Sequence, residues 1–201
     1  MTTPSDKTQL RARLRAARVA RSPAELARSG AALAAHALEL PELVQATTVA
    51  CYASVGAEPP TATLRAGLRA RGVRVLLPIV RDDLDLDWAV DGTEELTRTG
   101  RALLEPGGAR LGREAIEQAE VLFVPALAVG ADGTRRPVPG GCYDRALPRR
   151  RRGALVVAVV FDEEVLVTVP TQPHDESVDA ALRPSGLTRF SHPASEDAPA
   201  R

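Results

Sequence analysis

Hydrophobic and polar positions along the chain follow two periods, one typical of helices and one typical of strands. Apolar residues recur at helical spacing over 6–20, with arginines around them. Ser22 followed by Pro23 is typical of a helix start, which predicts a second helix over 23–39. A third helix is expected over 61–72, where a glycine closes the pattern.

Continuous or alternating apolar runs predict the strands. The run 119–129 is almost wholly apolar, as is 154–161, and such runs suit parallel strands covered on both faces. Residues 84–90 alternate strictly and predict a half-exposed strand. Two further strands are expected over 47–54 and 73–80. Smaller elements are expected in three places: a short helix near 112–118, a short helix near 143–150 and extended chain near 164–169.

The repeated alternation of strands and helices predicts the fold class α/β. We expect a single three-layer domain over 6–186, with a mostly parallel central sheet and helices on both faces. A disordered tail is expected over 187–201, where the chain is polar and carries Pro and Ser. Ligands of such sheets bind beyond the carboxyl ends of the strands, which points to 53–60, 126–144 and 170–175.

Composition narrows the function classes. The 201 residues carry 26 basic and 26 acidic side chains, and only 3 % are aromatic, so a nucleic-acid partner is not expected. No apolar run reaches the roughly 20 residues that span a bilayer, and no secretory signal is evident, so no membrane partner is expected. The two cysteines, Cys51 and Cys142, form neither a disulfide framework nor a zinc pattern, which favours a cytoplasmic location.

The loop over 130–145 is the first candidate for chemistry. Gly140 and Gly141 near a helix start could bring backbone N–H groups to a phosphate, and arginines nearby add charge. Asp144 could help to hold magnesium together with phosphate oxygens. No Walker or dinucleotide motif is present, and an ordinary surface turn stays an alternative.

Three other segments have both a functional and a plain interpretation. His174 and Asp175 could supply a base or a second metal carboxylate, or form a turn. Glu58, held by the two prolines after it, could accept hydrogen bonds from an amino-heterocycle, or be a solvated loop acid. The arginine run 149–152 could attract an anionic substrate, or lie in a solvated loop.

The order of several short motifs resembles a known family, the 5-formyltetrahydrofolate cyclo-ligases. The motifs are Lys7-x-x-Leu10-Arg11, Tyr-Ala-Ser-x-Gly-x-Glu-Pro at 52–59, Leu-Pro at 77–78, Leu-x-Trp at 86–88, Leu-Glu-Pro at 104–106, Val-Pro-Ala-Leu-Ala-Val at 124–129, Gly-Gly-Cys-Tyr-Asp-Arg at 140–145 and Pro-x-x-Pro-His-Asp at 170–175. The resemblance covers about residues 6–186. It implies a single α/β domain that is expected to act as a monomer.

The resemblance also implies an activity. The family converts 5-formyltetrahydrofolate to 5,10-methenyltetrahydrofolate with ATP and Mg²⁺. The formyl oxygen takes the γ-phosphoryl group, N10 closes the ring on the phosphorylated imine, and phosphate leaves. Phosphorylation makes a poor leaving group a good one, so the protein mainly positions two substrates and stabilises phosphoryl charge.

By this similarity the site residues fall into three groups. ATP would contact Lys7, Arg11, Arg135, Arg136, Pro137, Val138, Pro139, Gly140, Gly141, Cys142 and Tyr143, the folate would contact Ala53 and Glu58, and Asp144 and Asp175 would support magnesium. Lys7 is the only lysine among 26 basic residues. Contact with the ATP phosphates would explain why a lysine and not an arginine stands at this position. No covalent nucleophile is expected.

The chain departs from the family pattern in the loop. The family reads Arg-Leu-Gly-Arg-Gly-x-Gly-Tyr-Tyr-Asp, where this chain has Pro137, Val138, Pro139 and Cys142 at the third, fourth, fifth and eighth positions. Proline removes an N–H donor and fixes φ, and valine removes a charged phosphate contact. An inactive relative that binds folate or nucleotide therefore stays the alternative to an enzyme. An interaction protein that uses the arginines at 149–152 is a third interpretation.

Overall fold

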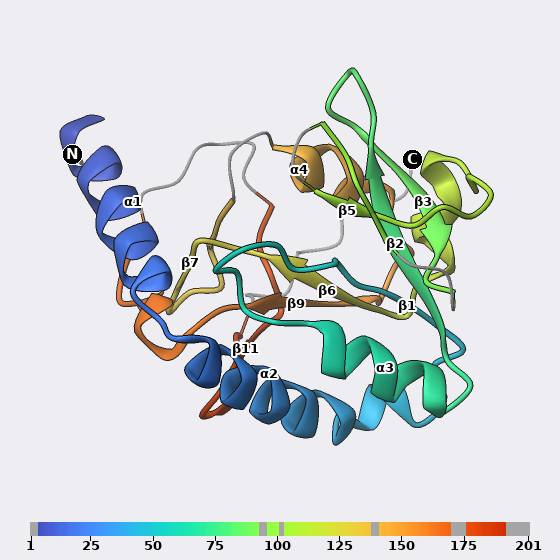
Figure 1. Ribbon diagram of the computed structural model, residues 1–201, viewed down its shortest axis with the longest axis horizontal. Helices are drawn as coiled ribbons and strands as arrows, with labels where there is room; N and C mark the ends of the chain where they lie inside the picture. The colour runs from blue at the N-terminus through green and yellow to red at the C-terminus, as the bar shows by residue number, and fades with distance from the viewer. Residues whose placement is uncertain (1–3, 93–95, 101–102, 138–140, 170–175, 192–201) are drawn as a thin grey trace, which may run out of the picture.

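The computed structural model describes residues 4–92, 96–100, 103–137, 141–169 and 176–191, with side chains from residue 8 onward. Its main sheet has seven strands in the order β12-β11-β9-β6-β1-β2-β3 (Figure 1). The strands are β1 Thr48–Ala50, β2 Arg74–Val80, β3 Leu86–Val90, β6 Val121–Pro125, β9 Leu155–Val159, β11 Ala180–Arg183 and β12 Gly186–Arg189. All neighbours pair in parallel except β2 with β3 and β11 with β12 at the two edges.

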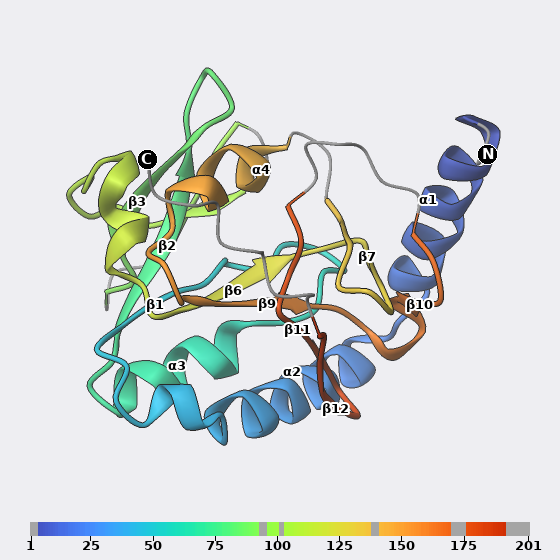
Figure 2. The ribbon, with the colours of Figure 1, turned by 180° about the vertical axis from the view of Figure 1, so that it is seen from behind.

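Helices cover both faces of this sheet, as the sequence predicts. The long helices α2 (Pro23–Leu38) and α3 (Ala62–Ala70) pack on one face, where Leu33 and Leu64 join the sheet core (Figures 1 and 2). Helix α2 begins with a capping box at Ser22, which confirms the expected start. Shorter helices cover the other face, namely η2 Arg113–Gln118, α4 Cys142–Ala146 and η3 Leu147–Arg149. The fold is therefore a three-layer α/β domain.

A small second sheet carries the N-terminal helix. The sheet has the order β10-β7-β8, and helix α1 spans Pro4–Val19. Its strands are β7 Ala128–Gly130, β8 Arg135–Arg136 and β10 Val165–Leu166. The single strand expected over 119–129 is thus divided, because the Leu127 N–H bonds to Arg136 O instead of continuing the main sheet. This division brings the loop after β6 back toward the end of the main sheet.

The remaining elements are short. They are η1 Pro41–Leu43, β4 Thr97–Arg98, β5 Leu104–Glu105 and η4 Asp162–Glu164. Strands β4 and β5 pair with each other, and the Glu105 side chain accepts a hydrogen bond from the Val80 N–H at 3.0 Å. That bond holds the small hairpin over the end of β2. In the described part of the chain, no helix combines the length and apolar character needed to cross a membrane.

The strand predicted over 84–90 forms, but the expectation that it is half-exposed is wrong. Asp85 and Asp87 are buried. Asp85 pairs with Arg149 at 2.6 Å and Arg113 at 3.1 Å, and Asp87 accepts from the Gly112 N–H. Burial opposes ionisation of Asp85, but the hydrogen bonds from Arg149 and the Leu86 N–H and the charges of Arg149 and Arg113 together outweigh it, so the pKa of Asp85 is lowered. Polar positions of this alternating pattern therefore face arginines instead of water.

The expected start of the tail at residue 187 is also wrong. Residues 186–189 form β12, which pairs with β11 at the edge of the main sheet. Arg189 adds an ion pair with Glu42 at 2.8 Å. Backbone pairing at a sheet edge orders this segment although its side chains are mostly polar. Residues 192–201 lie outside the described part of the chain.

Candidate functional site

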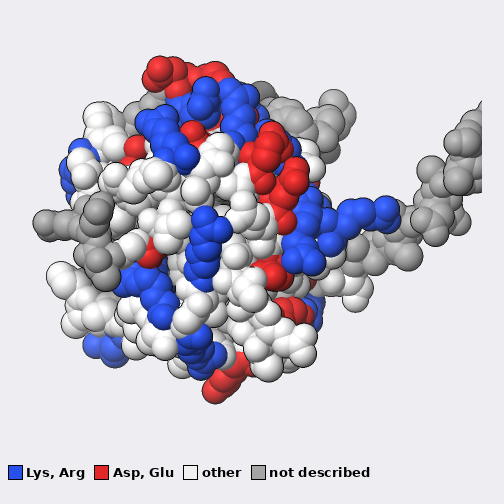
Figure 3. All heavy atoms as spheres, turned by 90° about the vertical axis from the view of Figure 1, so that its right-hand side faces the viewer, with Lys and Arg blue, Asp and Glu red and all other residues white. Residues whose placement is uncertain are grey.

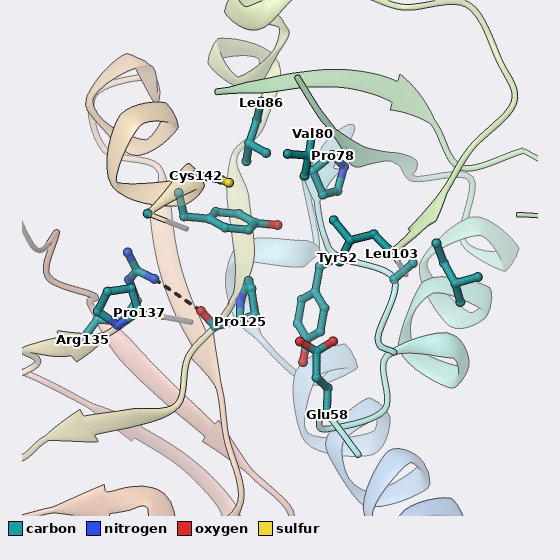
Figure 4. A pocket seen from close by; sticks show the side chains of 14 residues that line it. Tyr52, Glu58, Pro78, Val80, Leu86, Leu103, Pro125, Arg135, Pro137 and Cys142 are labelled. Atoms are coloured by element: carbon teal, nitrogen blue, oxygen red, sulfur yellow. Dashed lines mark hydrogen bonds between the residues drawn. The ribbon is translucent and has the colours of Figure 1, made fainter. Parts of the chain in front are cut away.

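A pocket opens at the carboxyl ends of β1, β2 and β6, where the strand order predicts a ligand site (Figure 4). Its walls are mostly apolar, with a few polar groups among them. The lining residues are Tyr52, Ala53, Glu58, Pro78, Val80, Leu86, Leu103, Leu104, Pro125, Arg135, Pro137, Gly141, Cys142 and Tyr143. Apolar walls with few polar groups are typical of sites for flat organic ligands.

Glu58 enters the pocket from a loop that is held at both ends. The Tyr52 hydroxyl donates to Pro59 O at 2.9 Å, and the Thr61 hydroxyl donates to Tyr52 O at 2.6 Å. The Val55 N–H donates to Glu58 Oε2 at 2.9 Å, which fixes the carboxylate. Figure 4 shows this carboxylate beside the Tyr52 ring. Glu58 is therefore a placed acceptor and not a freely solvated acid.

The environment of Glu58 disfavours its charge. Burial raises the pKa of Glu58, and the hydrogen bond from Val55 and the charge of Arg18 only partly oppose the rise. In the described part of the chain, no arginine lies within ion-pair distance of this carboxylate. Such a group gains from a ligand that donates hydrogen bonds to it, because the ligand replaces lost hydration.

Arg135 and Asp144 join the loop to the opposite wall. Arg135 is 0 % exposed, and one guanidinium nitrogen donates to Pro125 O at 3.4 Å, the dashed line in Figure 4. Another nitrogen forms an ion pair with Asp144 Oδ1, and that oxygen also accepts from the Glu176 N–H at 3.4 Å. The pair links β8 to α4 beneath the pocket. Arg135 thus has a structural partner inside the protein.

Tyr143 lines the pocket, and its hydroxyl has no hydrogen-bond partner among the described residues. Its side chain is buried, and its hydroxyl makes no hydrogen bond within the described residues. The ring meets Trp88 edge-on, with centroids 6.5 Å apart. Burial raises the pKa of Tyr143 well above its ordinary value, so the hydroxyl is a neutral donor. A buried hydroxyl without a partner is costly unless a ligand bonds to it.

Positive side chains gather beside α1 and β8. Burial, then the charges of Arg136 and Arg15, lowers the pKa of Arg11, which places Arg11 and Arg136 close together. The Arg11 Nε is buried and has no hydrogen-bond partner among the described residues. Two guanidinium groups near each other favour binding of an anion beside them. Lys7 belongs to the same helix, four residues before Arg11, although its side chain lies outside the described part.

A magnesium site made of protein side chains alone does not fit the described residues. They contain no group of three His, Cys, Asp or Glu side chains that could hold a metal ion. Asp144 is already paired with Arg135 through Oδ1, which leaves Oδ2. Magnesium bound mainly through nucleotide phosphates needs only one or two carboxylates. Asp175 and His174 lie outside the described residues, so their expected roles stay predictions.

The structure thus brings most of the predicted site residues that it describes to one place. Ala53, Glu58, Arg135, Pro137, Gly141, Cys142 and Tyr143 all line the pocket. Val138, Pro139 and Gly140 lie outside the described residues. Sequence reasoning missed the wall formed by Tyr52, Pro78, Val80, Leu86, Leu103, Leu104 and Pro125. Several of these residues, such as Val80 and Pro125, lie at the carboxyl ends of strands, and this position is the sequence signal that could have identified them.

The arginine run at 149–152 is largely neutralised. Arg149 pairs with Asp85, Arg150 with Glu176 at 3.1 Å, and Arg151 with Glu120 at 3.4 Å. Figure 3 shows acidic and basic side chains intermixed on the face of the molecule at the β3 edge. These contacts favour a structural role for the run over an anion-attracting patch.

Comparison with known proteins gives consistent results. The model of the 5-formyltetrahydrofolate cyclo-ligase family matches residues 3–184. A 5-formyltetrahydrofolate cyclo-ligase of Mycolicibacterium smegmatis is 38 % identical over 186 residues, which cover 90 % of this chain and 95 % of that protein.

Two solved structures share the fold. The NMR structure of Aquifex aeolicus 5,10-methenyltetrahydrofolate synthetase has a TM-score of 0.78 and 24 % identity, over 96 % of both chains. A 5,10-methenyltetrahydrofolate synthetase from Mycoplasma pneumoniae has a TM-score of 0.69 and 18 % identity, over 88 % of this chain and 98 % of that one. These two structures share the fold, and the family match with the 38 % identical relative shows that the chain belongs to the 5-formyltetrahydrofolate cyclo-ligase family.

Proposed function

We propose that this protein converts 5-formyltetrahydrofolate to 5,10-methenyltetrahydrofolate with the consumption of ATP. The observation that carries the proposal is the pocket, where an apolar wall surrounds Glu58 and the Tyr143 hydroxyl, which has no hydrogen-bond partner among the described residues. Membership of the cyclo-ligase family supplies the reaction. We further propose that the enzyme is a cytoplasmic monomer with no nucleic-acid or membrane partner.

The pocket suits the reduced pterin of the folate. The flat ring would pack between apolar side chains such as Pro78, Val80 and Leu104, while its N–H groups donate to Glu58. Ala53 would leave room beside the ring. The Tyr143 hydroxyl is a donor for a carbonyl oxygen of the substrate, either the ring oxygen or the formyl oxygen. These contacts would orient the formyl group toward the loop that begins at Arg135.

The phosphates of ATP would bind beside α1 and β8. Arg11 and Arg136 would share contacts with the negative charge of the phosphates, and Lys7 would add a third cation. The remaining residues of the loop from Pro137 to Cys142 would contact the nucleotide as the resemblance implies. Magnesium would accompany the phosphates, with Asp144 and Asp175 as the proposed carboxylates.

The reaction requires the protein to position the two substrates and does not require a side chain that bonds covalently to either of them. The formyl oxygen accepts the γ-phosphoryl group and ADP leaves. N10 then attacks the activated formyl carbon and closes the five-membered ring, and loss of the N10 proton and of phosphate leaves the methenyl bridge. Holding N10, the formyl group and the phosphate in line lowers the entropic part of the barrier. Cations around the transferring group stabilise the charge that develops on it.

A second candidate function is binding without turnover. Pro137 lines the pocket and offers no N–H to a phosphate, and Cys142 stands where the family pattern has tyrosine. Such changes would weaken phosphoryl transfer while leaving the folate wall intact. The two candidates differ in ATP-dependent product formation.

The test follows methenyltetrahydrofolate by its absorbance, with purified protein, 5-formyltetrahydrofolate, ATP and Mg²⁺. We expect product only when ATP is present and a large loss of activity in Glu58→Gln. Glu42→Gln is the matched control, because Glu42 pairs with Arg189 outside the pocket. Folate binding by calorimetry without product would favour the second candidate. Absence of both binding and product would refute the proposed function.

A further inference from the structure

Helix α1 is attached to the body of the protein mainly through its C-terminal half. Leu14 is buried against Leu127 and Ala128 of the small sheet, and Leu10 is partly buried there. Figures 1 and 2 show the N-terminal turns extending beyond β7 and β10. Lys7 therefore lies on the part of the helix that projects from the molecule, and Arg11 lies where the packed part begins.

Four positions of α1 share one face of the helix, which we call the stripe. At 100° per residue, Lys7, Arg11, Leu14 and Arg18 fall within about 60° of one another around the helix axis. Leu14 and Arg18 are the buried members of this stripe. The direction of the stripe at Leu14 and Arg18 consequently sets where Lys7 and Arg11 lie.

Arg18, at the C-terminal end of the stripe, makes hydrogen bonds to two separate segments of the chain. Its Nε donates to Glu164 Oε1 at 2.6 Å, and its Nη2 donates to Glu164 Oε2 at 2.8 Å and to Ala126 O at 2.6 Å. The Phe161 N–H donates to Glu164 Oε2 at 2.8 Å, which fixes the carboxylate. The two side chains are only 8 % and 1 % exposed. We call Arg18, Glu164 and Ala126 O the α1 clasp.

The clasp also lies near the folate part of the site. Burial lowers the pKa of Arg18, but the hydrogen bond and charge of Glu164 outweigh it, so the net pKa is raised and the guanidinium stays charged. Ala126 directly follows β6, whose last residue, Pro125, lines the pocket. One side chain thus connects the helix that bears the cations to the strand end that forms the pocket wall.

We propose that Arg18 and Glu164 are positioning residues that fix the direction of α1 and so hold Arg11 and Lys7 at the nucleotide. The proposal rests on the proposed function for its ligand. Arg11 lies about 10 Å from Arg18 along the helix, so a tilt of about 6° at the clasp moves it by about 1 Å. A displacement of that size is enough to reduce the rate or affinity by up to about 100-fold.

Arg21 provides a matched control at the same end of the helix. Its guanidinium lies 3.8 Å from the Phe161 ring centroid, and it pairs with Glu163. Its side chain is more exposed, at 19 %, and its carboxylate partner is 44 % exposed. Arg21 has the same charge and a similar place, but it makes no bond to Glu164 or Ala126 O.

The test compares Arg18→Lys with Arg21→Lys in the full-length protein. A lysine keeps the charge but offers one nitrogen in place of the planar guanidinium, whose two nitrogens bond the Glu164 oxygens and Ala126 O. We expect Arg18→Lys to raise the KM for ATP roughly 10- to 100-fold, while the KM for the folate changes less than about twofold. Glu164→Gln should change the kinetics in the same direction, and Arg21→Lys should resemble the wild type.

Trypsin provides a readout that does not depend on turnover, because α1 carries several arginines. Cleavage within α1 should be faster in Arg18→Lys than in Arg21→Lys and the wild type. Equal effects of the two variants, or a lowered melting temperature with unchanged KM for ATP, would overturn the proposal. Failure of the proposed function would appear differently, as a wild type that makes no product, and the trypsin comparison would still decide whether the clasp holds α1.

Discussion

The fully buried guanidinium of Arg135 forms an ion pair with Asp144, nine residues later in the chain. The pair joins β8 to the start of α4, and Pro137 and Gly141 on either side of the loop line the pocket. Both residues were expected at the ligand, Arg135 on phosphate and Asp144 on magnesium. Their mutual contact gives each a structural role as well.

Breaking this pair should destabilise the protein strongly. Asp144→Asn removes the charge of Asp144 from beside the buried Arg135 guanidinium, so we expect the free energy of unfolding to fall by about 3–5 kcal/mol. Urea unfolding followed by circular dichroism measures the change. Arg189→Ala, which removes a more exposed ion pair with Glu42, is the control and should cost less than about 1 kcal/mol. Similar values for the two variants would contradict the structural role of the Arg135–Asp144 pair.

Glu58 should make stability and folate binding depend on pH in opposite directions. Because the pKa of Glu58 is raised above 4.5 in the folded protein, its contribution to stability is full below pH 4.5 and is lost as pH rises through the raised pKa. The stability of Glu58→Gln relative to the wild type should therefore increase as the pH rises from about 4 to about 8. Denaturant titrations at several pH values in this range measure the difference.

Folate affinity of the wild type should rise over the same range, because the ionised carboxylate is the stronger acceptor for pterin N–H groups. Calorimetric titrations at several pH values measure it, with Glu58→Gln as the control that lacks the ionisable group. If the stability difference between variant and wild type does not change with pH, the assignment of the titration to Glu58 is wrong.

The two tyrosines of the pocket should respond differently to loss of the hydroxyl. Tyr143→Phe removes a hydroxyl that has no partner within the described residues, so stability should hardly change. The KM for the folate should rise about 2- to 12-fold, since one hydrogen bond contributes about 0.5–1.5 kcal/mol. Tyr52→Phe removes the bond to Pro59 O and should instead lower the free energy of unfolding by about 1–3 kcal/mol.

Thermal unfolding and steady-state kinetics on both tyrosine variants separate the two effects. A large loss of stability in Tyr143→Phe would mean that the hydroxyl has a partner inside the protein. An unchanged KM for the folate would remove Tyr143 from the list of substrate contacts.

Restoring the family pattern in the loop should raise activity. Replacing Pro137, Val138 and Pro139 with Gly, Arg and Gly restores two N–H donors and one charged phosphate contact. A charge-assisted hydrogen bond contributes about 1.5–3 kcal/mol, so we expect at least a tenfold gain in kcat/KM for ATP. Pro137→Gly alone is the control, which restores one donor and no charge. No gain in the triple variant would show that this loop does not limit the reaction.

Local patterns predicted most of the fold because burial periodicity depends on neighbouring residues. The strand over 73–80 and the capped start at Ser22 were confirmed. The predictions failed where distant partners decide the outcome. The alternation around Asp85 predicted exposure, but Asp85 is buried and pairs with Arg113 and Arg149, which lie far along the chain. The β11–β12 edge was missed because its short, mixed sequence has no strong period and is ordered by pairing with β9.

The sequence alone determined the α/β class, the strand ends where a ligand would bind, and the motifs that place the chain in its family. These follow from periodicity and from residue order, which need no coordinates. The tertiary structure decided which side chains meet: Glu58 with Tyr143 around one pocket, and Arg18 with Glu164 across 146 positions. Contacts between residues so far apart in the sequence depend on how the whole chain folds, so the local pattern of apolar and polar residues does not predict them.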